Sequence, residues 1–279
     1  MRTRYRKILV AAGSALASMA LLAPAAEATP VPAPYQDFSG CPSSAESDFV
    51  AFCFKYEFSG GHFQLGKKNI PVTTPIIFRG GERYVTGEFL GNSEAGIVPV
   101  AQYVEGGLLG LTGNKELDEL LAGYPALAVK ATVESAGTPL GSMVEPPFTL
   151  PVKVHLENPL LGSTCYIGSG TEPIKLNLTT GTTAPPAPNK PITGVPSGEF
   201  EEEAARPEVL RTSGGLFVDN AFAVPGANGC VLTIGSHHIS INSLINSAAA
   251  LPSAAGKNEV KLNYSLSLVS QETAYSGAL

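Results

Sequence analysis

The sequence predicts an all-β protein, mainly antiparallel, folded as a β-sandwich with two short helices. Three observations predict this class: several segments alternate apolar and polar residues, the chain contains 30 Gly and 23 Pro, and only 15% of its residues are charged. Alternation with a period of two turns one face of a strand toward a core and the other toward water. Frequent Gly and Pro favour turns between short strands over long helices.

The first 28 residues have the parts of a signal peptide. Basic residues open the chain, residues 8–22 form an apolar run, and Ala26 and Ala28 are the small residues that a signal peptidase reads. The run is shorter than the roughly 20 apolar residues that span a bilayer. We therefore expect cleavage after Ala28 and no membrane span afterwards. The expected location is the extracellular medium, with cell-wall association as a further option.

The charge of the exported part excludes two classes of partner. Cleavage removes four of the 18 basic residues and one of the 24 acids, and so leaves 14 basic and 23 acidic residues, a formal charge of −9. Nucleic acid and anionic lipid both require clustered Lys and Arg. We therefore expect neither as a partner.

All four cysteines, Cys41, Cys53, Cys165 and Cys230, lie in the exported part. An even number of thiols in an oxidising compartment predicts disulfides, and three pairings are possible. We favour Cys41–Cys53 and Cys165–Cys230, because the first pair closes a short local loop and leaves the other two to join distant segments. The chain has no C-x-x-C motif and no His close to a Cys in sequence, which argues against a metal site or a catalytic thiol.

The exported chain is expected to begin with a Pro-rich, extended or disordered leader over 29–40, followed by a β-sandwich domain over 41–279. Pro71 and Pro75 cannot donate to a sheet, so the hairpin arm that contains them is expected at an edge or with a bulge. A helix is predicted at 114–122, where Asn114 can cap the N-terminus and three Leu form an apolar stripe. Alternation predicts strands at 50–58, 62–65, 70–78 and 127–133, with a hairpin turn at 67–69.

The clearest strand pair lies in the middle of the chain, at 150–156 and 174–178. In each arm every second residue is apolar. The polar residues of the first arm and its end, Lys153, His155 and Glu157, are expected on the wet face, where His155 is expected to have a cross-strand partner. These arms predict two half-buried strands with Cys165 between them.

The C-terminal part begins with a Pro-dense connection at 184–198. We expect it to cross between sheets or to form a mobile surface loop, and it would divide the domain into two sub-blocks. A Greek-key connection through this segment is compatible with the pattern. Strands are predicted at 216–224 and 231–234, a helix at 241–249 ended by Pro252, and a closing strand at 260–268 with Lys261, Asn263, Ser265 and Ser267 outward.

No catalytic, cofactor-binding or metal-binding residue is predicted, and no cofactor is expected. Residues 91–95 approach G-x-S-x-G but end in Ala. Residues 235–238 place Ser236 beside His237 and His238, yet a polar turn is the favoured interpretation, since triad members come from distant segments. The four His show no metal-binding spacing. The acidic run 199–203 is interpreted as a solvated face.

Glycan binding is an alternative, since sandwich modules hold sugars on aromatic platforms. The chain has no Trp, and the candidate platforms are Tyr56, Tyr84, Tyr103 and Tyr124. For each of these Tyr, packing within the fold is the favoured interpretation.

A resemblance to a known family rests on the run VKVHLENPLLGSTCYIGSGTEPIKLNLTTGTTAPPAPNKPITG and the later NGCVL and LPSAAGKNEVKLN segments. These blocks resemble a family of exported actinobacterial proteins without a known activity. The resemblance covers most of residues 150–268. It implies export, a β-rich fold and a Cys165–Cys230 bridge, and it implies no activity.

The sequence leads to three hypotheses of function. The first is a secreted, non-enzymatic β-sandwich protein that works by surface contact. The second is a glycan- or cell-wall-binding module, with cell-wall polysaccharide or another surface protein as partner, and an exposed row of Tyr would favour it. The third is an extracellular hydrolase whose site is assembled from scattered residues. A pocket that brings a Ser or Asp against a His would favour this third hypothesis.

Overall fold

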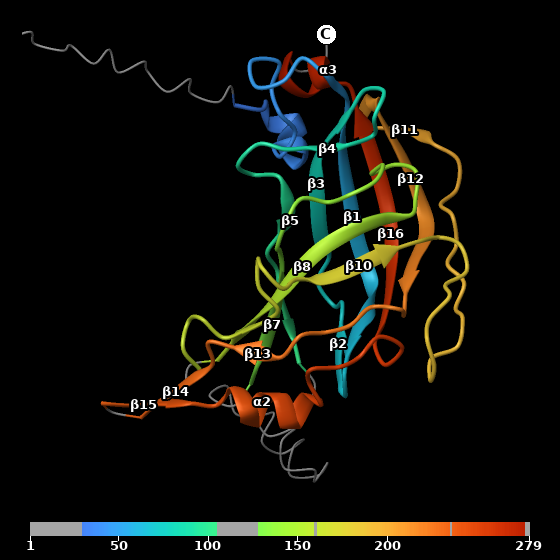
Figure 1. Ribbon diagram of the computed structural model, residues 1–279. Helices are drawn as coiled ribbons and strands as arrows, with labels where there is room; N and C mark the ends of the chain where they lie inside the picture. Colours follow the sequence, from blue (N-terminus) through green and yellow to red (C-terminus); the bar gives the residue numbers. More distant parts are fainter. Residues whose placement is uncertain (1–29, 105–127, 159–160, 235, 277–279) are drawn as a thin grey trace, which may run out of the picture.

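The computed structural model describes residues 30–104, 128–158, 161–234 and 236–276, and in these ranges the chain forms antiparallel sheets (Figure 1). Strands make up 47% of the structure, and the three helices of these ranges are short. This confirms the predicted all-β, sandwich-like class.

The larger sheet, sheet A, has eight strands. The order along it is β11-β12-β16-β1-β3-β4, while β2 pairs with β1 and β5 pairs with β3. The longest strands of this sheet, β1, β12 and β16, lie in its middle. Strands β1 and β16 come from opposite ends of the described chain and pair with each other. The strands are β1 (Val50–Leu65), β2 (Lys68–Pro71), β3 (Ile76–Arg83), β4 (Phe89–Leu90), β5 (Gly96–Val98), β11 (Glu201–Glu203), β12 (Arg206–Asp219) and β16 (Glu259–Val269).

The second sheet, sheet B, has six strands in the order β13-β9-β8-β7-β6, with β10 paired to β8. Its strands are β6 (Ala101–Tyr103), β7 (Lys130–Ser135), β8 (Phe148–Glu157), β9 (Tyr166–Ile167), β10 (Ile174–Leu178) and β13 (Ala227–Asn228). The remaining elements are a separate hairpin, β14 (Val231–Ile234) and β15 (His237–Ser240), and the helices η1 (Ala33–Phe38), α2 (Asn242–Ala249) and α3 (Gln271–Ser276).

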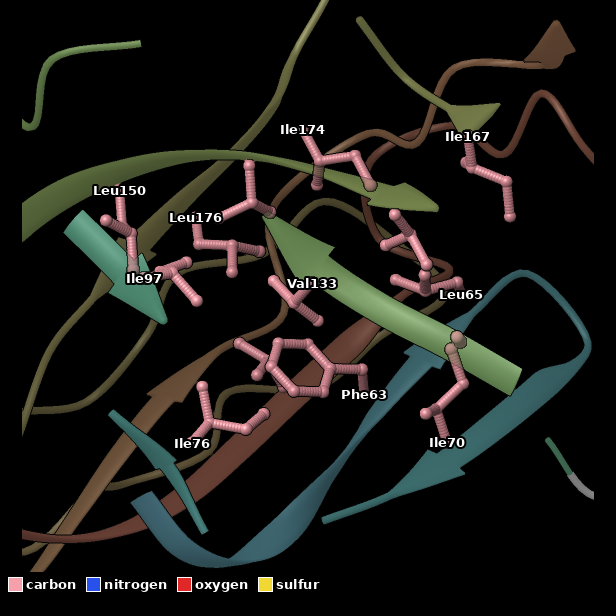
Figure 2. Packing of buried hydrophobic residues seen from close by; sticks show 14 of the residues in the cluster. Phe63, Leu65, Ile70, Ile76, Ile97, Val133, Leu150, Ile167, Ile174 and Leu176 are labelled. Carbon is pink, nitrogen blue, oxygen red and sulfur yellow. The ribbon is translucent and has the colours of Figure 1, made fainter. Parts of the chain in front are cut away.

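The predicted central pair is present as β8 and β10. The two strands are antiparallel, with Ile174 opposite Val152. Their apolar positions are buried, and Lys153 and His155 lie on the outer face, as the alternation predicted. Figure 2 shows side chains of sheet B, such as Val133 and Leu150, pointing toward Phe63 and Ile76 of sheet A.

Strand β1 differs from the prediction, because the strands expected at 50–58 and 62–65 form one strand of 16 residues. Its pairing with β16 shifts at a bulge between Phe58 and Gly60. The next residue, Gly61, has φ +105°, and a Cβ there would lie 1.9 Å from the Lys261 carbonyl oxygen. The two Gly thus bend the strand without ending it.

The hairpin after β1 is one residue tighter than expected. Leu65 lies opposite Lys68, so the turn consists of residues 66 and 67, and Asn69 already belongs to β2. Strand β2 pairs with β1 alone within the described chain. The edge position predicted from Pro71 is confirmed for β2. The arm predicted as one strand at 70–78 is divided, however: Pro75 lies in the gap before β3, and β3 is paired on both sides in sheet A.

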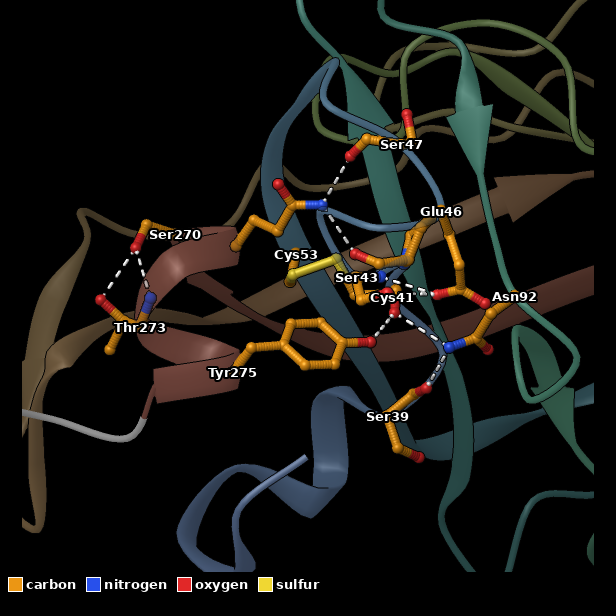
Figure 3. Close-up of a disulfide and its surroundings, with 12 residues drawn as sticks. Ser39, Cys41, Ser43, Glu46, Ser47, Cys53, Asn92, Ser270, Thr273 and Tyr275 are labelled. Carbon is orange, nitrogen blue, oxygen red and sulfur yellow. Dashed lines mark hydrogen bonds between the residues drawn. A yellow bond between two sulfur atoms is a disulfide. The ribbon is translucent and has the colours of Figure 1, made fainter. Parts of the chain in front are cut away.

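The outer face of sheet A carries a second, smaller apolar cluster, which corrects two predictions. The leader is not disordered from residue 30 onward, because η1 packs Tyr35 and Phe38 on this face together with α3. Ser265 and Ser267, expected in water, are also buried, and their hydroxyls bond to the side chains of Arg211 and Glu203 on the neighbouring strands. Figure 3 shows the Tyr275 hydroxyl of α3 donating to the Cys41 carbonyl beside the Cys41–Cys53 disulfide.

An ion-pair network joins η1 to sheet A. The Asp37 carboxylate accepts from the Arg206 guanidinium at 2.7 Å and from the Lys55 amine at 2.8 Å. Burial raises the pKa of Asp37, but the hydrogen bonds and charges of Arg206 and Lys55 lower it by more, so the pKa lies below its ordinary value. The folded state therefore favours the ionised carboxylate.

Replacing Asp37 by Asn should lower the free energy of unfolding at pH 7 by about 1–2 kcal/mol, since Arg206 and Lys55 lose their charged partner. The pKa of Asp37 is lower in the folded protein than in the unfolded chain. The ionised carboxylate therefore stabilises the fold fully above the unfolded-state pKa, and this stabilisation is lost as the pH falls through the folded-state pKa. Denaturant unfolding between pH 2 and 7 measures this. The difference between wild type and Asp37→Asn should shrink in acid, whereas Asp48→Asn, at an exposed site, should show little difference at any pH.

The Pro-dense segment is the crossing between sheets that the sequence allowed. It connects β10 of sheet B to β11 of sheet A and is bonded along its length. The Asn189 amide donates to the carbonyls of Asn220 and Asn258, and Val195 exchanges backbone hydrogen bonds with Leu216. The segment is an ordered surface crossing.

The helices agree with the sequence in part. Helix α2 confirms the helix predicted at 241–249, with Ile245 and Ala249 buried and Leu244 exposed. The helix predicted at 114–122 lies outside the described residues. Helices η1 and α3 were not predicted, because both are too short for a helical period to be recognised.

Candidate functional site

Both predicted disulfides are present. Cys41 and Cys53 have Cα atoms 5.3 Å apart, and Cys165 and Cys230, separated by 65 residues, have Cα atoms 4.0 Å apart. The second bridge joins the β8–β9 connection to the start of β14. It therefore ties the start of β9, and with it Tyr166, to the segment between β13 and β14, while the pairing of β9 with β8 is backbone pairing.

The outer face of sheet B carries a dense group of polar and aromatic side chains. The register places Tyr166 of β9 opposite His155 of β8, and His155 opposite Thr132 of β7. The neighbouring rows add Glu134 opposite Lys153. We call Thr132, Glu134, Lys153, His155, Glu157 and Tyr166 the outer-face cluster.

The polar groups of the cluster form one chain across β7 and β8. The Lys153 amine lies 3.1 Å from one Glu134 oxygen, and the other Glu134 oxygen lies 3.6 Å from His155 Nδ1. On the far side, a Glu157 oxygen lies 3.9 Å from the same Nδ1 and accepts from the Thr132 hydroxyl at 2.6 Å. Each carboxylate is thus held in place by a neighbouring strand.

Tyr166 completes the cluster. Its ring stacks on the His155 imidazole with centroids 4.5 Å apart and 17° between planes, and the Lys153 amine lies 4.2 Å from the Tyr166 centroid. These contacts hold the Lys153 amine and the His155 imidazole against one aromatic ring. The Nε2 atom of His155 is inaccessible to solvent and has no hydrogen-bond partner. Only Nδ1 of the imidazole can therefore contact a ligand.

A second aromatic ring lies at the edge of the same face. Tyr103 of β6 is 61% exposed and lies opposite Lys130, whose amine is 5.5 Å from the ring centroid. Lys130 is in turn opposite Glu157. An exposed ring, a cation and a carboxylate therefore follow one another across three strands.

The sequence motifs considered for hydrolysis do not assemble a catalytic group in the described residues. Glu94, in the segment 91–95, pairs with Arg79 and accepts from the Ser39 hydroxyl. His62 contacts Glu259, and His155 contacts two Glu rather than a Ser or Asp. Residues 237 and 238 lie in strand β15 and not in the polar turn that we predicted.

A small apolar recess of about 50 Å³ lies at the end of the sandwich beside α2. Its described lining is aliphatic apart from Lys68, with Leu65, Ile70, Leu156 and Ile245 among the contributors. No Ser, Asp or His belongs to this described lining, so the recess does not supply the pocket that a hydrolase requires.

The three candidate tyrosines that the structure describes do not form a row. Tyr56 is buried in the core, where its hydroxyl donates to the Met143 carbonyl at 2.6 Å. Tyr84 follows β3 of sheet A, Tyr103 ends β6 of sheet B, and Tyr124 lies outside the described residues. The acidic run is exposed as predicted, except that Glu203 pairs with Arg206.

Sequence reasoning placed Lys153, His155 and Glu157 on one wet face but missed Glu134 and Tyr166. Both come from strands whose pairing to β8 depends on tertiary structure. The available signal was the position of Tyr166 directly after Cys165, because a disulfide at that position orients the residue that follows it.

No protein-family model, curated protein or solved structure matches this chain. The resemblance to exported actinobacterial proteins therefore stays a prediction. Within the described ranges no helix has the length and apolarity needed to cross a membrane, and no group of His, Cys, Asp and Glu there could hold a metal ion.

Proposed function

We propose that the protein is exported and acts outside the cytoplasm as a non-enzymatic binding protein, with the outer face of sheet B as its contact surface. Two disulfides fit an oxidising compartment, and the signal-peptide pattern of the first 28 residues supports export. Cell-wall material or a protein of the cell surface is the partner class.

The outer-face cluster is the observation that carries this proposal. Its amine, imidazole and carboxylates are held by contacts across β7, β8 and β9, so few rotamers are lost when a ligand binds. A charged network on a partly exposed sheet face also has both donors and acceptors for a polar ligand. The outer-face cluster is therefore a pre-organised binding surface.

The same geometry favours binding over catalysis. General acid–base chemistry needs a substrate held in a site that excludes water, with the catalytic group at hydrogen-bond distance. The cluster lies on the face of a sheet, and the contacts of His155 are with Glu134, Glu157 and Tyr166. None of these supplies a nucleophilic hydroxyl for His155 to activate as in a Ser–His pair.

Co-sedimentation of the mature protein with isolated cell walls tests the proposal. We expect saturable binding that weakens about tenfold in Lys153→Ala, since the cluster loses its amine contact to Tyr166 and Glu134. Lys67→Ala is the charge-matched control, because Lys67 is exposed in the β1–β2 turn of sheet A. Absence of wild-type binding, or equal loss in both variants, would contradict the proposed surface.

The same samples test the absence of catalysis. We expect no increase in soluble reducing ends or released peptides when walls are incubated with saturating protein. Release at a rate that follows protein concentration would show a hydrolase and overturn the non-enzymatic assignment.

Glycan binding is the second candidate function, favoured by the exposed ring of Tyr103 beside Lys130 and Glu157. Aromatic faces stack on sugars, and the neighbouring charges can bond to hydroxyls. If the ligand is a glycan, binding should persist on protease-treated walls and weaken in Tyr103→Ala but not in Tyr84→Ala. Loss of binding after protease treatment would instead identify a protein partner.

A further inference from the structure

The apolar recess beside α2 is an unfilled space at one end of the core. It has a volume of about 50 Å³, and its described lining comes from both sheets and from α2. Figure 2 shows the sheet contributions on the right of the drawn cluster, with Leu65 and Ile70 from sheet A and Ile167 from sheet B. Protein interiors are packed almost as densely as organic crystals, and voids larger than a water molecule are few. The recess therefore has room for an additional apolar group.

Helix α2, which forms one wall of the recess, is bonded to both sheets. The Asn246 side chain accepts from the N–H of Ala227, in β13 of sheet B, at 2.6 Å. At the end of the helix the Ala249 carbonyl accepts from the N–H of Lys67, in the β1–β2 turn of sheet A, at 2.9 Å. The wall cannot move inward without breaking these hydrogen bonds, so the recess is formed before any ligand arrives.

The lining determines which ligands the recess can hold. Apart from Lys68, its described members are Leu, Ile, Val and Ala, and none of them is aromatic. An apolar cavity that offers water too few polar partners stays dry and takes apolar ligands, and a cavity that holds a benzene ring measures about 150 Å³. The recess is about a third of that size. It therefore fits the narrow end of an alkyl chain and is too small for a ring.

The recess continues to the surface along α2. Ala248 lines the recess and is half-buried, and Leu244, four residues earlier, is 49% exposed. Residues four apart lie on the same face of a helix. An alkyl chain whose end occupies the recess can therefore cover Leu244 where it leaves the protein.

The charge distribution favours an anionic head group at this end. Residues 220–256, which supply α2, contain no Asp, Glu, Lys or Arg, although the mature chain carries a formal charge of −9. Figure 1 shows α2 at the end of the molecule opposite α3. A carboxylate beside this stretch meets less repulsion than it would beside the acidic remainder. We propose that the recess binds the end of an unbranched alkyl chain, as carried by a fatty acid, at a site separate from the outer-face cluster.

Isothermal titration calorimetry of the mature, oxidised protein with hexanoate, octanoate and decanoate, each below its micellar concentration, tests the inference. We expect one saturable site whose dissociation constant falls about fourfold with each added methylene, because each methylene removes further apolar surface from water. Absence of saturable binding across the series would overturn the inference.

Methyl-labelled isoleucines locate the site in the wild-type protein. In NMR spectra the δ1-methyl signals of Ile70, Ile167 and Ile245, which line the recess, should shift when decanoate is added. Those of Ile76 and Ile97, in other parts of the core, should stay in place. Shifts that leave out the three lining residues would contradict the assigned site.

Ala248→Leu fills the mouth of the recess and should raise the dissociation constant for decanoate at least tenfold. Ala223→Leu makes the same change at an exposed site outside the described lining and should leave the constant unchanged. Thermal unfolding checks that both variants keep the fold. Decanoate binding that a folded Ala248→Leu leaves unchanged would overturn the inference.

Flotation with phosphatidylcholine vesicles distinguishes two sources of the alkyl chain. A protein that binds decanoate but does not float with the vesicles takes free fatty acids. Co-flotation that Ala248→Leu abolishes and Ala223→Leu preserves would show that the same recess takes the chain of a membrane lipid. Equal co-flotation of both variants, without binding of decanoate, would assign lipid contact to another surface and overturn the inference.

Discussion

Replacing Cys165 and Cys230 together by Ala is expected to lower the free energy of unfolding by about 4 kcal/mol. The bridge closes a loop of 65 residues, and its removal restores that loop's conformational freedom to the unfolded chain. Both residues are buried, so Ala avoids leaving an unpaired polar group in the core. Equilibrium denaturation in urea, without reductant, measures the loss.

The Cys41–Cys53 bridge provides the matched comparison. It spans only 12 residues, so its removal should cost about 3 kcal/mol, less than the longer loop. Hydrogen exchange should also quicken in β9 and in the β14–β15 hairpin when the Cys165 bridge is absent, because the bridge joins them. A smaller loss for the longer loop would show that local packing, and not loop closure, dominates.

Replacing Phe148 by Ala is expected to cost about 4 kcal/mol, the second large effect. Phe148 lies on β8 of sheet B, and its ring contacts Tyr56, Phe78 and Phe217 of sheet A at centroid distances of 5.9, 6.3 and 5.3 Å. The truncation removes the contacts of this ring with the three aromatic rings of sheet A and leaves a cavity between the sheets. Urea unfolding should show a lower midpoint with a similar slope.

Two variants test whether this cost comes from the inter-sheet ring. Phe148→Leu keeps most of the apolar volume and should cost less than the Ala variant. Phe49→Ala removes a ring that is 64% exposed and should change stability little. Equal losses at Phe148 and Phe49 would contradict the assigned role of the core.

Most of the strands could be predicted because a half-buried strand must alternate. Apolar and polar residues alternate in β8, β10 and β16 because one face of each strand packs in the core and the other faces away from it. The alternation did not predict the burial of Ser265 and Ser267, whose hydroxyls bond to the Arg211 and Glu203 side chains on the opposite face. It also divided β1 at Gly60 and Gly61, because a bulge has the same local composition as a turn.

The candidate site was less predictable than the fold. Alternation placed Lys153 and His155 on the wet face, but the contacts of His155 come from Glu134 on β7 and Tyr166 on β9. These contacts depend on strand order and register, which local patterns do not encode. The hairpin strand β15 was missed for a related reason, since its four residues are exposed on both sides and show no alternation of burial.

By itself the sequence determined the β-rich class, the buried face of the central strands and the favoured disulfide pairs. These properties follow from the side-chain period, from the even number of thiols and from the short spacing of Cys41 and Cys53, all of which can be read along the chain. Tertiary structure alone decided which strands became neighbours, that η1 and α3 cover sheet A, and that Tyr166 stacks on His155. Those outcomes depend on contacts between residues far apart in sequence, whose free energy is gained only when the whole core is assembled.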